Sequence, residues 1–449
     1  MSDANSQEPL PELEYPREDW GGFFKKHFGP SMLWALLGIG GSHIVLAPTM
    51  AALFGGFTIW VVLLIYAVKY GAWDLGVRYN YGAGRNPIEG YGDLPGPKHW
   101  GQWLTLIIYL VGWTVIVSAV GFNTATFAAT LIPGIGAIQL YVILVALAVA
   151  FVMISRYNWL ESFLRVFVLL LALLIIIGVF VSPPSMDTLG ETLFTAPNLA
   201  GAGFLGLFAA LAGFAPTGLS TTAVIGSWSM AKKQGARLLK EKNLDPHDER
   251  YGDYIASWIK TGRRDYNIGF LFSLVLIISM ILLSTAVLYP EPPTDSNLAI
   301  AVANILSESV GAWTFYVIAI GAFAALYSTV ITVLDGASRV DADLLPLVLE
   351  RPMNTEVVRR VIALLMGIAS IVPILIIGQL PVTLLVFSAA LMSILQIFFY
   401  FANYFIVRRH LAKRFQPGAK ARAYYWVSIV IVVLFGVVGA LGRLGLVGQ

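Results

Sequence analysis

Two short segments of this 449-residue chain combine glycine, proline and hydroxyl residues with apolar neighbours. Glycine and proline are poor helix-interior residues, so both segments should free backbone N–H and carbonyl groups from helical hydrogen bonds. Freed carbonyls, hydroxyls and an imidazole can bind an ion or a small polar solute, and we expect them to form a substrate site. The expected site residues are Gly40, Gly41, Ser42 and His43 in the first segment, and Ala215, Pro216, Thr217 and Ser220 in the second.

Each segment lies inside an apolar stretch long enough to cross a membrane, which takes about 20 residues. The chain is 57% hydrophobic and only 12% charged, whereas soluble domains carry about 25% charged residues. An all-α, multi-pass membrane protein with eleven transmembrane helices is therefore expected. The eleven predicted spans are residues 30–54, 57–77, 103–132, 137–154, 163–181, 201–230, 268–288, 313–334, 358–377, 382–407 and 424–441.

The positions of lysine and arginine predict the orientation. The connections expected on the outer side hold no Lys or Arg, and only Arg443, at the end of the last span, falls outside. Cytoplasmic loops carry the excess of these residues in membrane proteins. The distribution therefore predicts a cytoplasmic N-terminus, an outer C-terminus and a location in the cell (plasma) membrane.

The two interrupted stretches are the first and the sixth spans. Interruptions at matching places in two halves are typical of transporters built from inverted repeats. We expect a 5+5 inverted repeat with broken helices 1 and 6 and one extra helix. The predicted parts are an N-terminal arm (1–28), a first repeat (29–182), a second repeat (200–410) with a cytoplasmic loop (231–265) carrying a short amphipathic helix, and the eleventh helix with its preceding loop (411–449).

Other polar residues lie within or beside the spans. Asn123 of the third span and Gln396 of the tenth are candidates to face the substrate, with hydrogen bonding between helices as the alternative. Lys69, in the inner half of the second span, is expected to extend to the inner surface. Asp335 and Arg339 lie four residues apart at the cytoplasmic end of the eighth span, so we expect an ion pair that is either an inner gate or purely structural.

His43 is the ionisable residue nearest a predicted span centre. An intramembrane histidine can carry a proton, bind a metal or donate to a solute, and the alternative is a neutral imidazole bonded to a freed carbonyl. The adjacent Ser42 makes no nucleophile–base pair, because neighbours in sequence do not face each other on a helix. The chain also has no cysteine and no Gly-x-x-x-x-Gly-Lys-Ser/Thr loop. We therefore expect no enzyme activity, no cofactor and no nucleic-acid partner.

Several motifs resemble the Nramp family of divalent-metal transporters, particularly its more distant branches. They are Gly29-Pro30, Ala215-Pro216, Trp73-Asp-Leu-Gly-Val-Arg78-Tyr79 with Gly90-Tyr91, and Val333-Leu-Asp335-Gly336-Ala-Ser-Arg339. The resemblance implies the inverted-repeat fold shared with the amino-acid/sodium symporters. It also implies altered ligands. The family has Asp-Pro-Gly-Asn where this chain has Gly40 to His43, and Met-Pro-His where it has Ala215 to Thr217.

No carboxylate lies near the predicted centre of any span, and a dication without a nearby anion is costly to bury. Our leading hypothesis is therefore a secondary transporter with alternating access and an uncharged central site that has lost Mn/Fe binding. Its expected partners are the lipid bilayer and a small polar solute or a different ion. One alternative is a low-affinity Mg/Mn transporter that uses hydroxyls, carbonyls and His43 as at most one metal ligand. The other is a non-transporting membrane scaffold or sensor.

Overall fold

The computed structural model describes residues 13–154, 166, 172–199, 201–307 and 311–443. This part of the chain is all-helical and holds no strand. Eight of its helical spans are long and apolar enough to cross a membrane. They are α4 (Phe57–Gly82), α6 with η3 and α7 (Trp100–Ile107, Ile108–Trp113, Thr114–Leu131), α8 (Ala137–Ile154), η4 with α14 (Glu249–Tyr251, Gly252–Val287), α17 (Trp313–Leu349), α18 with α19 (Thr355–Ala369, Ile371–Ile377), α20 (Pro381–His410) and α21 (Ala419–Arg443).

Two further apolar stretches are broken, in the places that the sequence predicts. The first consists of α2 (Pro30–Ile39), the π-helical segment η1 (Ser42–Leu46) and α3 (Ala47–Phe54). The second consists of α11 (Ala202–Phe214) and α12 (Thr221–Ala231). The predicted fifth span lies partly outside the described residues, and its described helix, Ala172–Val181, meets α10 (Met186–Phe194) at 110°. The count of eleven and the orientation remain predictions.

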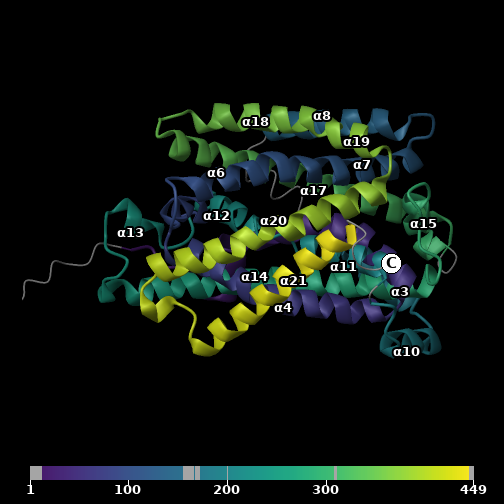
Figure 1. Cartoon of the computed structure of the whole chain (residues 1–449), viewed down its shortest axis with the longest axis horizontal. Helices are drawn as coiled ribbons and strands as arrows, with labels where there is room; N and C mark the ends of the chain where they lie inside the picture. Colours follow the sequence, from purple (N-terminus) through teal and green to yellow (C-terminus); the bar gives the residue numbers. More distant parts are fainter. Residues whose placement is uncertain (1–12, 155–165, 167–171, 200, 308–310, 444–449) are drawn as a thin grey trace, which may run out of the picture.

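The long helices run along one axis of the molecule (Figure 1). In that view α8 and α18 form one edge of the bundle, and α4 and α21 lie toward the other, while α13 is at one end and α10 and α15 are at the opposite end. The shorter elements are α1 (Trp20–Lys26), α5 (Pro87–Gly90), η2 (Tyr91–Asp93), α13 (Arg237–Glu241), α15 (Leu298–Ala303), η5 (Asn304–Leu306) and η6 (Lys413–Phe415).

Two helices are longer than the apolar pattern predicts. The helix α14 begins at Gly252, so much of the predicted loop 231–265 is helical, and α17 continues to Leu349 instead of ending at 334. Hydropathy identifies only the part of a helix that lies in the hydrocarbon core of the membrane. It does not detect polar helical turns that extend beyond that core. The short helix expected in that loop is α13.

An aromatic cluster fixes the first half of the first broken stretch. The Trp34 ring of α2 lies 5.1 Å from Trp73 of α4 and 5.5 Å from Tyr266 of α14, measured between ring centroids. All three side chains are buried. Such edge-to-face contacts add to the stabilisation from apolar burial, so α2 is held against α4 and α14.

Candidate functional site

The first break is a local change of helix type. The helix α2 ends at Ile39, and the backbone then continues as η1, in which Ala47 N bonds Ser42 O. Gly40 is needed here for space, because a Cβ atom at Gly40 would overlap the Thr329 side chain of α17. A π-helical segment keeps most backbone groups bonded. The first break therefore exposes fewer carbonyls than the sequence led us to expect.

His43 belongs to a buried hydrogen-bond network that joins η1, α4 and α14. Its Nε2 lies 3.0 Å from the Ser273 carbonyl, which can only accept, so Nε2 donates. The neutral ring then accepts at Nδ1 from the Ser42 hydroxyl, at 2.8 Å. The Tyr66 hydroxyl bonds Ser273 Oγ at 2.7 Å. His43 is fully buried and bonds a carbonyl, as in the alternative of a neutral imidazole, but that carbonyl belongs to the continuous helix α14 and is not one freed by a break.

The second break is a true interruption, and proline explains it. Pro216 has no N–H, so the Ala212 carbonyl, four residues earlier, cannot be bonded within the helix. Two side chains from other helices bond this carbonyl instead. Lys69 Nζ of α4 donates to Ala212 O and Ala215 O, both at 2.8 Å, and Gln396 Nε2 of α20 donates to Ala212 O at 3.2 Å.

The expectation that Lys69 extends to the inner surface was wrong. Its side chain is 1% exposed and lies at the middle of the 26-residue helix α4. It turns toward the second break because the carbonyls there replace the hydration that an ammonium loses on burial. The sequence did contain a signal for Lys69, because an ionisable residue deep in a span indicates a functional contact. The same signal identified His43 as a candidate.

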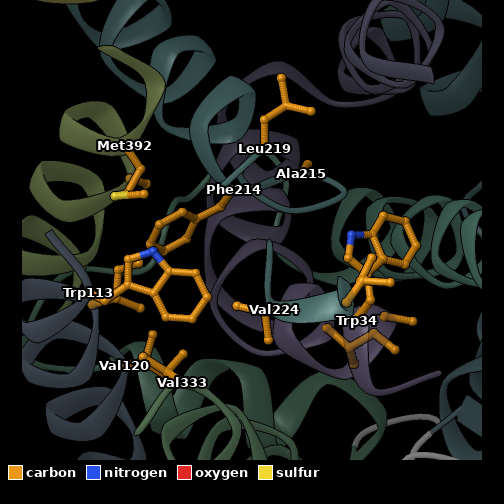
Figure 2. Packing of buried hydrophobic residues seen from close by; sticks show 14 of the residues in the cluster. Trp34, Trp113, Val120, Phe214, Ala215, Leu219, Val224, Val333 and Met392 are labelled. Atoms are coloured by element: carbon orange, nitrogen blue, oxygen red, sulfur yellow. The ribbon is translucent and has the colours of Figure 1, made fainter. Parts of the chain in front are cut away.

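A small cavity lies between the two broken stretches. Its volume is about 30 Å³, which suits roughly two water molecules or a very small solute. Figure 2 shows Trp113, Val120, Phe214, Val333 and Met392 gathered around this space. The complete lining is Gly41, Trp113, Ile116, Val120, Phe214, Thr217, Gly218, Ser220, Thr221, Thr329, Val333 and Met392.

The polar groups on the cavity wall are hydroxyls held by neighbouring bonds. Thr217 Oγ1 and Thr221 Oγ1 are 2.7 Å apart and bond each other. Trp113 Nε1 donates to Ser220 Oγ at 3.2 Å, and the Tyr109 hydroxyl donates to the Ser220 carbonyl. The wall is therefore mainly apolar, with an uncharged polar strip along the second break.

The predicted site residues fall into separate groups. Gly41, Thr217 and Ser220 line the cavity. Gln396, Ala215 and Pro216 belong to the second break, and Gly40, Ser42 and His43 to the first, but their side chains are not part of the cavity wall. Asn123 lies elsewhere: its Nδ2 donates to the Ala119 and Pro381 carbonyls, both at 2.8 Å, which joins α7 to the start of α20.

The predicted ion pair is present. Arg339 Nε lies 2.8 Å from Asp335 Oδ2, and Arg359 Nη1 of α18 lies 3.3 Å from Asp335 Oδ1. Arg359 also bonds Glu356 and the Val152 carbonyl. The pair is thus part of a network that connects α8, α17 and α18 on the side predicted to be cytoplasmic.

Sequence reasoning missed Lys69 and most of the cavity wall, including Trp113, Thr329 and Met392. Single apolar or hydroxyl residues in an apolar span carry no signal of which neighbour they face. Among the described residues, no group of three or more His, Cys, Asp and Glu side chains could hold a metal ion.

Comparisons with known proteins agree on one family and one fold. The model of the family described as natural resistance-associated macrophage protein-like (Nramp) matches residues 52–441. An uncharacterised protein of Pasteurella multocida is 24% identical over 331 residues, which cover 72% of this chain and 71% of that protein. The crystal structure of a mutant manganese transporter from Eremococcus coleocola superposes with a TM-score of 0.73 at 14% identity, covering 99% of this chain and 92% of that one.

A second solved structure has a similar fold. The crystal structure of MhsT in complex with L-phenylalanine gives a TM-score of 0.56 at 13% identity, covering 94% of this chain and all of that one. Likeness at these identities concerns the fold alone.

Proposed function

Because this chain belongs to the Nramp family, we propose that it is a secondary transporter that moves a small, uncharged polar solute by alternating access. The observation that carries the proposal is the small cavity between the two broken stretches, whose wall is mainly apolar with a few hydroxyls and backbone groups. Small-molecule sites commonly combine an apolar wall with a few fixed polar groups.

The donor set argues against a transition metal as the substrate. Mn²⁺ and Fe²⁺ sites need carboxylate, imidazole or thioether ligands. Met392 is the cavity's single residue of these types, and the His43 ring is occupied by Ser42 and Ser273. A thioether without an anionic ligand leaves the desolvation of a dication uncompensated.

The two repeats, residues 29–182 and 200–410, are part of this proposal. Its support is that residues of both broken stretches, Gly41 in the first and Thr217 in the second, border the same cavity. In alternating access, one repeat moves against the other around such a site. The cytoplasmic N-terminus and the cell-membrane location belong to the same proposal, on the strength of the lysine and arginine distribution.

Calorimetry on the purified protein tests the metal question. We expect no saturable heat with Mn²⁺, Mg²⁺ or Ca²⁺. Saturable Mn²⁺ binding that disappears in the His43→Ala variant would favour the divalent-cation alternative and contradict the proposal.

A thermal-shift screen tests the solute. Small neutral compounds with amide or hydroxyl groups should raise the melting temperature of the wild type, and Thr217→Val should reduce the shift. The matched control is Thr285→Val on α14, because Thr285 Oγ1 bonds the Ile281 carbonyl and neither residue lines the cavity. If no solute of this class is bound or taken up by proteoliposomes, the scaffold alternative gains support.

A further inference from the structure

The second break holds the side-chain nitrogen of Lys69 at carbonyl oxygens that lack helical partners. Pro216 removes the N–H that would have bonded Ala212 O, and the chain leaves helical geometry at Ala215. The C-terminal end of α11 therefore presents open carbonyls and the negative end of its dipole. In broken-helix transporters, such carbonyls and half-helix ends coordinate cations.

Lys69 is placed as a cation would be. Its Nζ is 2.8 Å from both Ala212 O and Ala215 O, and its side chain is buried. Within the described part of the chain, Lys69 forms no ion pair with a carboxylate. The carbonyl dipoles and the end of α11 are therefore its electrostatic partners.

A second polar side chain, that of Gln396, also contacts an open carbonyl of the break. Its Nε2 donates to Ala212 O at 3.2 Å and to Ser393 O at 3.3 Å, while its Oε1 is buried and has no hydrogen-bond partner. The two backbone carbonyls at Lys69 Nζ are neutral ligands. Such a set suits a monovalent cation, whereas a bound dication generally requires carboxylate.

We propose that the Lys69 ammonium is a tethered cation that takes the place of a bound inorganic cation at the second break. The wild-type protein then needs no sodium or metal there, and the ammonium repels a divalent ion that approaches. Removing the ammonium leaves an oxygen-lined site that accepts a free monovalent cation. The proposal goes beyond the proposed function, because it concerns the charge at the break and not the solute in the cavity.

The test compares thermal unfolding of wild type, Lys69→Ala and Lys69→Met in detergent, with sodium replacing choline at constant ionic strength. Lys69→Ala should melt below the wild type in choline and gain about 3 °C when sodium rises to about 150 mM. The matched control is Lys232→Ala, since Lys232 Nζ also donates to a backbone carbonyl, Phe28 O at 2.8 Å, but outside the break. The melting temperatures of the wild type and of Lys232→Ala should change by less than about 1 °C when sodium replaces choline.

Further arms make each outcome decisive. Equilibrium binding of radioactive sodium should be absent in the wild type, present in Lys69→Ala and weakened when Gln396→Leu is added. Saturable sodium binding by the wild type overturns the proposal. A folded Lys69→Ala variant whose melting temperature responds to no cation also overturns it. Failure of both Lys69 variants to fold in choline, sodium or potassium overturns it as well, because no free cation then replaces the ammonium. None of these results depends on solute transport, so they are distinct from a failure of the proposed function.

Discussion

Ser31 of α2 and Asp265 of α14 bond each other through both backbone and side chains. Ser31 N donates to Asp265 Oδ2 at 2.9 Å, and Ser31 Oγ donates to the Asp265 carbonyl at 2.7 Å. Gly29 N donates to Asp265 Oδ1 at 3.2 Å. A carboxylate from a distant helix therefore caps the first turn of α2, where backbone N–H groups have no helical acceptor.

Removing this cap should destabilise the protein. In Asp265→Ala the buried N–H groups of Gly29 and Ser31 lose their acceptor, and we expect a loss of about 2 kcal/mol. The melting temperature in detergent measures the effect. Asp253→Ala, at an exposed position in the first turn of α14, should cost less than about 0.5 kcal/mol. Equal melting temperatures for the two variants would show that the cap is unimportant.

Gly213 sets the distance between α11 and α20. A Cβ atom there would overlap the Ala389 carbonyl oxygen and lie 2.8 Å from the Ala389 carbonyl carbon. Because backbone cannot yield as a side chain can, Gly213→Ala should destabilise by about 3 kcal/mol, read from thermal or denaturant unfolding. Gly206 of the same helix has nothing within 4 Å of an added Cβ atom. Gly206→Ala should therefore be neutral or stabilise by up to about 1 kcal/mol, and a similar loss in both variants would refute the packing argument.

The Asp335 network can be tested as an inner gate because the chain contains no native cysteine. A single Thr217→Cys reports on the cavity, and adding Asp335→Asn should speed its labelling from the cytoplasmic side about tenfold. The reason is that the change removes the negative charge on α17 that pairs with the buried Arg359 of α18. Glu356→Gln removes another partner of Arg359 within α18 and should change the rate less than about twofold. Unchanged labelling in Asp335→Asn, with a lower melting temperature, would make the pair purely structural.

The N-terminal arm should undock as the pH falls. Arg17 N donates to His27 Nε2 at 2.9 Å, which requires that nitrogen to be unprotonated. Burial lowers the pKa of His27 below its ordinary value of 6.5, and the nearby Lys26 and Lys232 cations lower it further. The pKa of His27 is therefore lower in the folded protein than in the unfolded chain. Its contribution to folding stability is complete above about pH 6.5, and it is lost as the pH falls through the lower pKa of the folded state.

Hydrogen exchange measures this undocking. Protection of residues 17–28, corrected for intrinsic exchange, should fall as the pH drops below about 6.5 in the wild type and stay nearly constant in His27→Gln. His247→Gln changes an exposed histidine and should behave as the wild type. The same pH dependence in His27→Gln would assign the effect to another group.

Much of the architecture could be read from local sequence. Apolar length predicted α8 and its start at Ala137, because 18 consecutive residues without a charge leave few choices in a bilayer. Pro216 likewise predicted the second break, since a missing N–H acts on its own helix whatever surrounds it. The polar extensions of α14 and α17 were missed because hydropathy does not report helix beyond the hydrocarbon.

The sequence by itself determined a helical protein with many apolar spans and two interruptions. Only the tertiary structure decided which side chains meet at those interruptions. Lys69 contacts Ala212, 143 residues away, and His43 contacts Ser273, 230 residues away. A span that is apolar around its whole circumference gives no preferred face, so the packing of distant helices alone turns Lys69 toward the second break and His43 away from the cavity.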